Sequence, residues 1–143
     1  MVTGYRISNE FDAMDLTVIH GFISNSYWGT KIPFEIMRRA AENSLCFGVF
    51  TNAGQQVGFA RMVTDKATFA YLADVFILDD HRGIGLSKWL METILAHPDL
   101  QGLRRMVLAT KDAHSLYEQF GFKPLANPDI FMELWNPKVY NKT

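Results

Sequence analysis

The sequence lacks the features that would tie it to an oxidising compartment, a polyanion or a membrane. One cysteine among 143 residues cannot form an internal disulfide bond, which favours a reducing compartment. The 14 Lys and Arg residues are balanced by 15 Asp and Glu residues, whereas an electrostatic nucleic-acid binder carries a basic patch. No apolar run approaches the roughly 20 residues that cross a bilayer, and no secretory signal is visible. We therefore expect one cytoplasmic domain over residues 1–143, with no nucleic-acid or membrane partner.

The four histidines show no metal-ligand spacing with one another or with the cysteine, so no metal site is expected. Cys46 lies in an apolar stretch, which predicts a buried side chain that packs as a small hydrophobe and not a nucleophile.

Hydrophobic periodicity predicts an α+β domain with a mixed sheet. Three successive strands without a helix between them predict an antiparallel meander. The expected elements are a strand at 5–7, helices from Asp12 to 23 and from Pro33 to 43, strands at 45–50, 56–63 and 69–78, a helix from 86 that Pro98 ends, a strand at 106–109, a helix that Asp112 caps, and a last strand from Phe122 onward.

A glycine-rich loop joins the third strand of this meander to the next helix. Its residues are Arg82, Gly83, Ile84, Gly85, Leu86, Ser87 and Lys88. Small residues let a ligand approach the backbone, and the N–H groups at a helix start favour an anion, so a phosphate is expected here. The alternative is a tight turn with two solvated cations. The loop matches neither the P-loop nor the dinucleotide fingerprint.

The pattern Arg82-x-x-Gly85-x-Ser87 resembles the Q/R-x-x-G-x-G/A acetyl-CoA motif of the GCN5-related N-acetyltransferases, the GNAT family. The expected order of elements also looks like that family over nearly the whole chain. Ser87 departs from the pattern, since Gly or Ala is usual there. The resemblance implies a three-layer α/β/α domain whose mostly antiparallel mixed sheet is splayed at the fourth strand. It also implies acetyl-CoA as the cofactor, with its pyrophosphate held at the loop.

A second segment, from Leu116 to Phe122, resembles the family's L-Y-x-x-x-G-F motif. The resemblance implies that Tyr117 is the general acid that protonates the departing thiolate. A phenol with a pKa of about 10 can serve a thiol with a pKa of about 8.5, because it is protonated at working pH. The alternative is that Tyr117 is a core residue of its helix. Asp112, at the start of the same helix, is placed with the cofactor-binding residues.

The strand before the loop is implied to bind the pantetheine arm. The resemblance implies that Phe76, Ile77 and Leu78 pair their backbone with this arm, and that an N–H group there faces the thioester carbonyl, as an oxyanion donor does.

Three side chains are expected on the acceptor side. Alternation places Asp74 on the same face as Leu72 and Phe76, where its carboxylate would accept the substrate's proton or hold its charge. The alternative is a rim residue, or one paired with a basic side chain. Some family members have a base at the position of Tyr71. Tyrosine is a poor base, so this role is not carried over, and Tyr71 is placed with the substrate-binding residues. Trp28 is either a second aromatic wall or a core side chain.

The function implied is transfer of an acetyl group from acetyl-CoA to a primary amine of a small molecule or peptide, by direct attack in a ternary complex. Two alternatives stay open: a non-catalytic acyl-CoA-binding or sensing module, and a nucleotide-binding interaction domain. The apolar segment from Phe131 to Trp135 is compatible with a homodimer.

Overall fold

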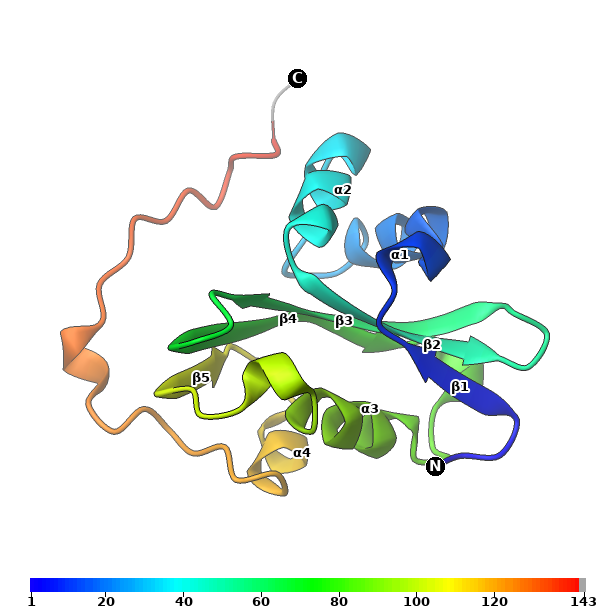
Figure 1. Cartoon of the computed structure of the whole chain (residues 1–143). Coiled ribbons are helices and arrows are strands. Elements are labelled where there is room, and N and C mark those ends of the chain that lie inside the picture. The colour runs from blue at the N-terminus through cyan, green and yellow to red at the C-terminus, as the bar shows by residue number, and fades with distance from the viewer. Residues whose placement is uncertain (142–143) are drawn as a thin grey trace. The chain divides into compact units, whose positions relative to one another are not determined.

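The structure is a computed structural model that describes residues 1–141 (Figure 1). It divides into two compact units, one covering residues 1–109 and one that begins at Thr110. That residues 1–143 form a single domain stays a prediction.

A five-stranded mixed sheet organises the first unit, with its strands in chain order across the sheet. The strands are β1 (Tyr5–Ser8), β2 (Leu45–Thr51), β3 (Gln56–Thr64), β4 (Phe69–Ile77) and β5 (Arg105–Leu108). Strands β1 to β4 pair antiparallel, and β4 pairs parallel with β5. The mostly antiparallel mixed sheet is therefore confirmed.

Helices cover both faces of this sheet, which makes the three layers expected (Figure 1). Two helices lie on one face and one lies on the other: α1 (Leu16–Ile23) and α2 (Phe34–Glu42), opposite α3 (Leu86–Leu95). Short 3-10 turns lie at Phe11–Ala13, Asp79–His81 and Pro98–Leu100. The second unit contains α4 (His114–Glu118) and a 3-10 turn at Pro128–Ile130.

Burial follows the helical spacing of the sequence. Helix α3 buries Leu86, Leu90, Met91 and Ile94, which is the stripe of a core-facing helix. On the other face, α1 and α2 close a core with Ile19, Ile23, Met37, Phe59 and Phe76. The sheet therefore carries a core on each face.

One expected helix start, at Asp12, and one expected N-cap, Asp112, are wrong. Asp12 lies in a 3-10 turn, and the N-cap of α1 is Asp15, whose carboxylate accepts the Val18 N–H at 3.2 Å. Asp112 does not cap α4, because the N-cap is Ala113, whose own N–H donates to Thr110 Oγ1 at 3.1 Å. In both places several polar residues lie near the helix start and could cap it. Which of them does so depends on where the backbone becomes helical.

The expected last strand is also wrong, because residues 122–141 form no strand. Pro124 and Pro128 interrupt this stretch and lack the N–H that a strand ladder needs. The apolar residues that follow have strand composition, but within the described chain they pair with no strand.

A fully buried glutamine ties the start of α1 to the sheet. Gln56 is 1% exposed; its Oε1 accepts the Asp15 N–H at 2.6 Å, and its Nε2 donates to the Gly58 carbonyl at 3.0 Å. Replacing one partner of a buried hydrogen bond leaves the other unsatisfied.

Gln56→Met keeps the length of this side chain and removes both hydrogen bonds. We expect the free energy of unfolding to fall by about 1–3 kcal/mol, measured by urea denaturation. Gln55→Met, at the exposed neighbouring position, is the matched control and should stay close to wild type. Equal stability of the two variants would show that the buried amide is not needed.

Candidate functional site

A β-bulge interrupts β4 at Asp74. Phe59 pairs with Phe76 and Arg61 pairs with Ala73, so a single β3 residue faces two residues of β4. Asp74 has a positive φ of 56°, a left-handed conformation in which Asp is enriched among non-glycine residues. Holding such a residue costs on the order of 1–3 kcal/mol, and bulges are frequent next to active sites. The bulge therefore marks the middle of β4 as a candidate site.

The bulge also corrects the expected faces of this strand. Leu72 pairs with Met62, whereas Phe76 pairs with Phe59. Because Phe59 and Met62 are three residues apart on β3, they point to opposite faces of the sheet. The expectation that Leu72 shares a face with Phe76 is wrong, since the extra residue shifts the alternation by one.

The Asp74 carboxylate is held by two other elements. Its Oδ2 lies 2.6 Å from Arg61 Nε on β3, and its Oδ1 accepts the indole N–H of Trp28 at 2.8 Å. Arg61 also donates to Ser44 Oγ at 3.1 Å. The side chains of Arg61 and Asp74 are 19% and 12% exposed. We call Asp74, Arg61, Trp28 and Ser44 the Asp74 cluster. Asp74 is therefore paired with a basic side chain, Arg61, which was one of the alternatives that the sequence left open.

Trp28 forms a partly exposed aromatic wall. Trp28 is 46% exposed, so it is not a core tryptophan. Its ring packs edge-on against Tyr27 at 5.1 Å and lies 6.2 Å from Phe22, which in turn stacks on Phe76 at 4.2 Å. A row of aromatic rings thus leads from the α1–α2 connection to β4.

Tyr71 lies on the same face of the sheet as the Asp74 cluster. It pairs with Val63, which is two residues from Arg61 on β3 and so points to the same side. Tyr71 is 38% exposed. The three residues expected on the acceptor side, Trp28, Tyr71 and Asp74, therefore share one face.

Beyond the bulge, β4 has an open edge. Strand β5 pairs with β4 only from Phe69 to Leu72, and within residues 1–141 the rest of β4 pairs with β3 alone. Leu78 donates its N–H to Val57 O at 2.8 Å. Because hydrogen-bonded and non-bonded pairs alternate along antiparallel strands, Ile77 directs its N–H and C=O away from β3. This is the splay expected at the fourth strand.

The glycine-rich loop follows this edge. Gly83 and Gly85 have φ values of 82° and 94°, so the turn needs glycine at both positions. This agrees with the tight turn that the sequence analysis gave as the alternative to a phosphate site. A Cβ at Gly83 would meet nothing within 4 Å, and one at Gly85 would meet only a Val2 methyl at 3.9 Å. Gly85 is the N-cap of α3 and contributes no side-chain cap. The first N–H groups of a helix have no intrahelical acceptor, so this backbone is open to a ligand.

The two cations of the loop differ in their contacts. Arg82 Nε donates to the Ile77 carbonyl at 2.8 Å, and its Nη1 lies 2.9 Å from Asp79. Lys88 is exposed on the first turn of α3. Arg82 thus links the loop to the open edge of β4.

The loop begins next to an open cleft of about 380 Å³ in the first unit. It is lined by Phe22, Gln55, Leu78, Asp79, Asp80 and His81. The Tyr5 hydroxyl lies 2.8 Å from His81 Nδ1, which ties this turn to β1. The cleft joins the end of β4 to the aromatic row.

Tyr117 and Asp112 belong to the second unit. Tyr117 is buried, at 7% exposed, and its ring packs edge-on against Phe122 at 5.9 Å. Gly121 follows with a φ of 92° and ends the helical turn, as expected. Asp112 is exposed. Burial of Tyr117 fits both the core role and the acid role that the sequence allowed.

Sequence reasoning missed Arg61 and Ser44. A signal was present for Arg61, since it is a charged residue between Ala60 and Met62, both fully buried. A charge at such a position needs a partner, and Asp74 on the next strand of the meander offers one. Ser44 carries no comparable signal.

The sequence profile of a family described as "Acetyltransferase (GNAT) domain" matches residues 42–124, more than half of the chain. The chain belongs to the GNAT acetyltransferase family. The matched range contains the Asp74 bulge, the open edge, the glycine-rich loop and Tyr117.

Relatives agree with this assignment. A presumed GNAT acetyltransferase from Xanthomonas campestris, solved as a crystal structure, is 47% identical with a TM-score of 0.95, covering 99% of this chain and 100% of its own. A presumed acetyltransferase of Gibberella zeae is 30% identical over 79% of this chain and 75% of its own. Glucosamine-6-phosphate N-acetyltransferase from Arabidopsis thaliana, 15% identical with a TM-score of 0.65 and covering 92% and 97%, shares the fold.

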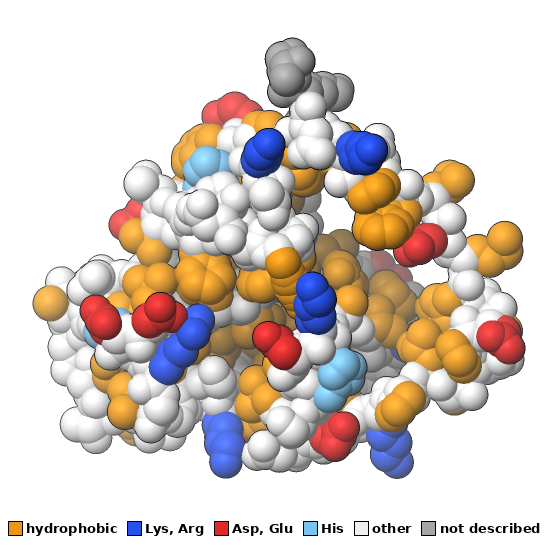
Figure 2. Space-filling view, turned by 180° about the vertical axis from the view of Figure 1, so that it is seen from behind, with side chains coloured by type: hydrophobic (Ala, Val, Ile, Leu, Met, Phe, Trp, Pro, Cys, Tyr) orange, Lys and Arg blue, Asp and Glu red, His pale blue; other side chains and the backbone are white. Residues whose placement is uncertain are grey.

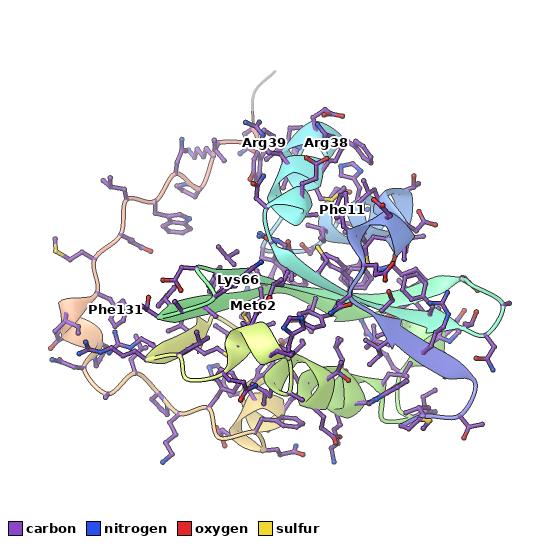
Figure 3. The ribbon with its side chains drawn as sticks, viewed as in Figure 1. Phe11, Arg38, Arg39, Met62, Lys66 and Phe131 are labelled. Atoms are coloured by element: carbon purple, nitrogen blue, oxygen red, sulfur yellow. The ribbon has the colours of Figure 1, made fainter. Side chains whose placement is uncertain are left out.

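Outside the site of this GNAT domain, Arg38 on α2 is paired within its own helix. Arg38 forms ion pairs with Glu35 at 2.7 Å and with Glu42 (Figure 3). Among residues 1–141, no helix is long and apolar enough to cross a membrane, and no cluster of His, Cys, Asp and Glu could hold a metal ion.

Cys46 lies close to the Asp74 cluster but is buried as a thiol. Its Sγ donates to the Ala41 carbonyl at 3.2 Å. Burial raises the pKa of the Cys46 thiol to about 11, although the nearby Arg61 acts in the opposite direction. A thiol in an unfolded chain has a pKa of about 8.5. The folded state therefore holds the proton more tightly, and stability should fall as the pH rises from about 8.5 through about 11.

We expect iodoacetamide at pH 8 to leave native Cys46 unmodified and to alkylate it fully in guanidinium chloride, as measured by intact-protein mass. Cys46→Ser, which offers no thiol, is the control. Rapid alkylation of the native protein would contradict the buried, protonated thiol and would reopen a nucleophilic role.

Proposed function

We propose that this GNAT domain transfers an acetyl group from acetyl-CoA to a primary amine by direct attack in a ternary complex. The observation that carries the proposal is one continuous track in the first unit. The open edge of β4 starts at the Asp74 bulge and leads to the glycine-rich loop at the start of α3. A thioester with a long arm and a pyrophosphate matches the two ends of such a track.

The loop suits the phosphates of the donor. Free N–H groups at the start of α3 and the charge of Lys88 attract an anion. The open space at Gly83 and Gly85 allows a phosphate to reach the backbone. Ser87 is small and keeps its N–H, so its departure from the family motif does not block this role.

The edge at Phe76, Ile77 and Leu78 suits the pantetheine arm, because the N–H and C=O of Ile77, at its centre, face away from β3. Arg82 now donates to the Ile77 carbonyl. Binding of the arm to that carbonyl would release the guanidinium toward the phosphates. Acetyl-CoA supplies the activated acyl group, and the residues of the chain hold it beside the acceptor. Asp112 is assigned to the cofactor on the resemblance alone.

The face that carries the Asp74 cluster suits the acceptor amine. An alkyl amine with a pKa of about 10.4 is mostly protonated at pH 7 and needs help to lose its proton. We assign this task to Asp74, directly or through a water molecule, with Arg61 and Trp28 fixing its carboxylate. Trp28 and Tyr71 would form the walls of the acceptor site.

Tyr117 is assigned the protonation of the departing thiolate. This role rests on the resemblance, and a phenol with the ordinary pKa of about 10 is protonated at neutral pH. A free, buried cysteine supports a reducing, cytoplasmic location. The second candidate function is an acyl-CoA sensor without turnover, which is favoured by Ser87 and by the ion pair between Asp74 and Arg61.

Tyr117→Phe removes the hydroxyl and keeps the ring. We expect acetyl transfer to slow by about 10²–10⁴-fold, the range of general acid catalysis, with CoA affinity unchanged by calorimetry. Tyr140→Phe, outside the proposed site, is the matched control. Transfer at the wild-type rate with intact CoA binding would remove the acid role of Tyr117.

Asp74→Asn keeps the shape of the side chain and removes its charge. If Asp74 handles the amine's proton, the loss in rate should be about 10²-fold or more at pH 7 and should shrink as the pH approaches the pKa of the amine. The pH profile of kcat/KM measures this. A loss that is equal at every pH would assign Asp74 a purely structural role.

Trp28→Phe removes the hydrogen bond that fixes the Asp74 carboxylate but keeps an aromatic ring at the wall of the acceptor site. We therefore expect a lower kcat with little change in the KM for the amine, as measured by steady-state kinetics. An unchanged kcat would show that Trp28 does not position Asp74.

A further inference from the structure

The glycine-rich loop has little packing of its own to fix its shape. Residues 82–85 are all exposed, and a Cβ at Gly83 would meet no atom within 4 Å. Glycine has more backbone freedom than any other residue, and a ligand that orders such a segment bears the cost in entropy. Holding the loop in its bound shape beforehand lowers that cost. The loop therefore needs to be held from its ends if its N–H groups are to bind a phosphate.

Charge does not replace this positioning. On the face that Figure 2 shows, the Lys and Arg side chains of the described residues lie scattered among other side chains instead of forming one basic patch. At the loop itself, Arg82 is paired with Asp79 at 2.9 Å. Oriented N–H groups at the start of α3 must then supply much of the attraction for an anion, and their effect depends on how accurately the backbone is placed.

A link from β1 holds the start of the loop. The Tyr5 hydroxyl lies 2.8 Å from His81 Nδ1, and the two rings meet edge-on with their centroids 5.7 Å apart. His81 is the last residue of the 3-10 turn at Asp79–His81, directly before Arg82. A tyrosine hydroxyl can donate to a neutral imidazole or accept from a protonated one. The Tyr5–His81 link is therefore available in both protonation states of His81.

The N-terminal segment that carries Tyr5 is itself anchored to the sheet. Tyr5 pairs with Thr51 on β2, and the Gly4 carbonyl accepts the Asn52 N–H at 3.0 Å. Val2, in the same segment, has a methyl group 3.9 Å from the place that a Cβ of Gly85 would take. The segment thus reaches the loop at both ends, before Arg82 and at the N-cap of α3, and Figure 1 shows it beside the chain that leads into α3.

We propose that Tyr5 and His81 are positioning residues for the phosphates of acetyl-CoA, and that they act through the backbone of the glycine-rich loop. This inference rests on the proposed function, since it takes acetyl-CoA as the ligand of the loop. In the donor complex described above, Arg82 leaves the Ile77 carbonyl. The Tyr5–His81 link does not involve that carbonyl, so it still ties the turn to the sheet when the donor is bound.

The first test is the affinity for CoA, measured by calorimetry. Tyr5→Phe keeps the ring and removes the hydroxyl, and we expect the Kd for CoA to rise about 3- to 10-fold, the effect of losing one hydrogen bond. The KM for acetyl-CoA should rise with it while kcat stays near the wild-type value. Tyr140→Phe is the matched control and should leave the Kd unchanged. An unchanged Kd in Tyr5→Phe would overturn the proposal.

A double-mutant cycle shows whether the two residues act through one link. His81→Ala should raise the Kd for CoA at least as much as Tyr5→Phe does. Adding Tyr5→Phe to His81→Ala should raise it no further, because the hydroxyl has then already lost its partner. A full additional increase in the double variant would show that the two residues act separately and would overturn the proposal.

Pantetheine distinguishes positioning of the loop from general stability of the fold. It carries the arm of CoA but no pyrophosphate, so its binding depends on the edge of β4 and not on the loop. The Kd for pantetheine, measured by NMR titration, should be the same in Tyr5→Phe and in wild type, whereas the Kd for CoA rises. An equal loss of affinity for both molecules would assign the pair a merely structural role and overturn the proposal.

These measurements also separate this inference from the proposed function, because binding of CoA requires no turnover. If Tyr5→Phe weakens CoA binding as expected but wild type acetylates no amine, the positioning role is supported and the proposed transfer fails. If wild type acetylates an amine and Tyr5→Phe binds CoA as tightly as wild type, the positioning role fails alone. A wild-type protein that does not bind CoA would overturn both.

Discussion

The left-handed backbone at Asp74 is the constraint on which the proposed site depends. One extra residue in β4 changes which side chains face the helices α1 and α2. Without it, the alternation from Leu72 onward would place Phe76 on the other face, away from Phe22. The ion pair with Arg61 and the hydrogen bond from Trp28 hold the bulge from two sides. The strain of the bulge and the contacts that hold it thus belong to one local arrangement.

The pairing of β5 with β4 ends at Leu72, and this exposes backbone groups of β4. A parallel pair that stops after Leu72 leaves the following backbone groups of β4 without a neighbour. Backbone N–H and C=O groups need partners, and a ligand with amide groups can supply them. The near-neutral charge of the chain is no obstacle to a polyanionic donor, because the start of α3 and Lys88 provide a local positive field.

Local signals were enough to predict most of the fold. Hydrophobic periodicity predicted the three strands of the meander and the helix from residue 86, and both are present. The helix start at Asp12 and the N-cap at Asp112 were predicted wrongly because several polar residues compete at each helix start. The last strand failed because strand composition does not guarantee a partner strand.

For the site, the glycine-rich loop could be predicted because its chemistry is contiguous in the sequence. The Asp74 cluster could be predicted only in part. Asp74 and Trp28 were named for their chemical types, but their hydrogen bond joins residues 46 apart. The bulge, which makes that contact, has no glycine to mark it. Arg61 was missed because periodicity describes one strand at a time, whereas its partner Asp74 lies on the neighbouring strand.

The central claim is catalytic transfer, and thiol release from acetyl-CoA over a panel of primary amines tests it most directly. The account predicts CoA release that depends on the amine and equals the acetylated amine formed. Tight CoA binding by calorimetry, with no amine-dependent release from any member of the panel, would contradict it and would favour the sensor.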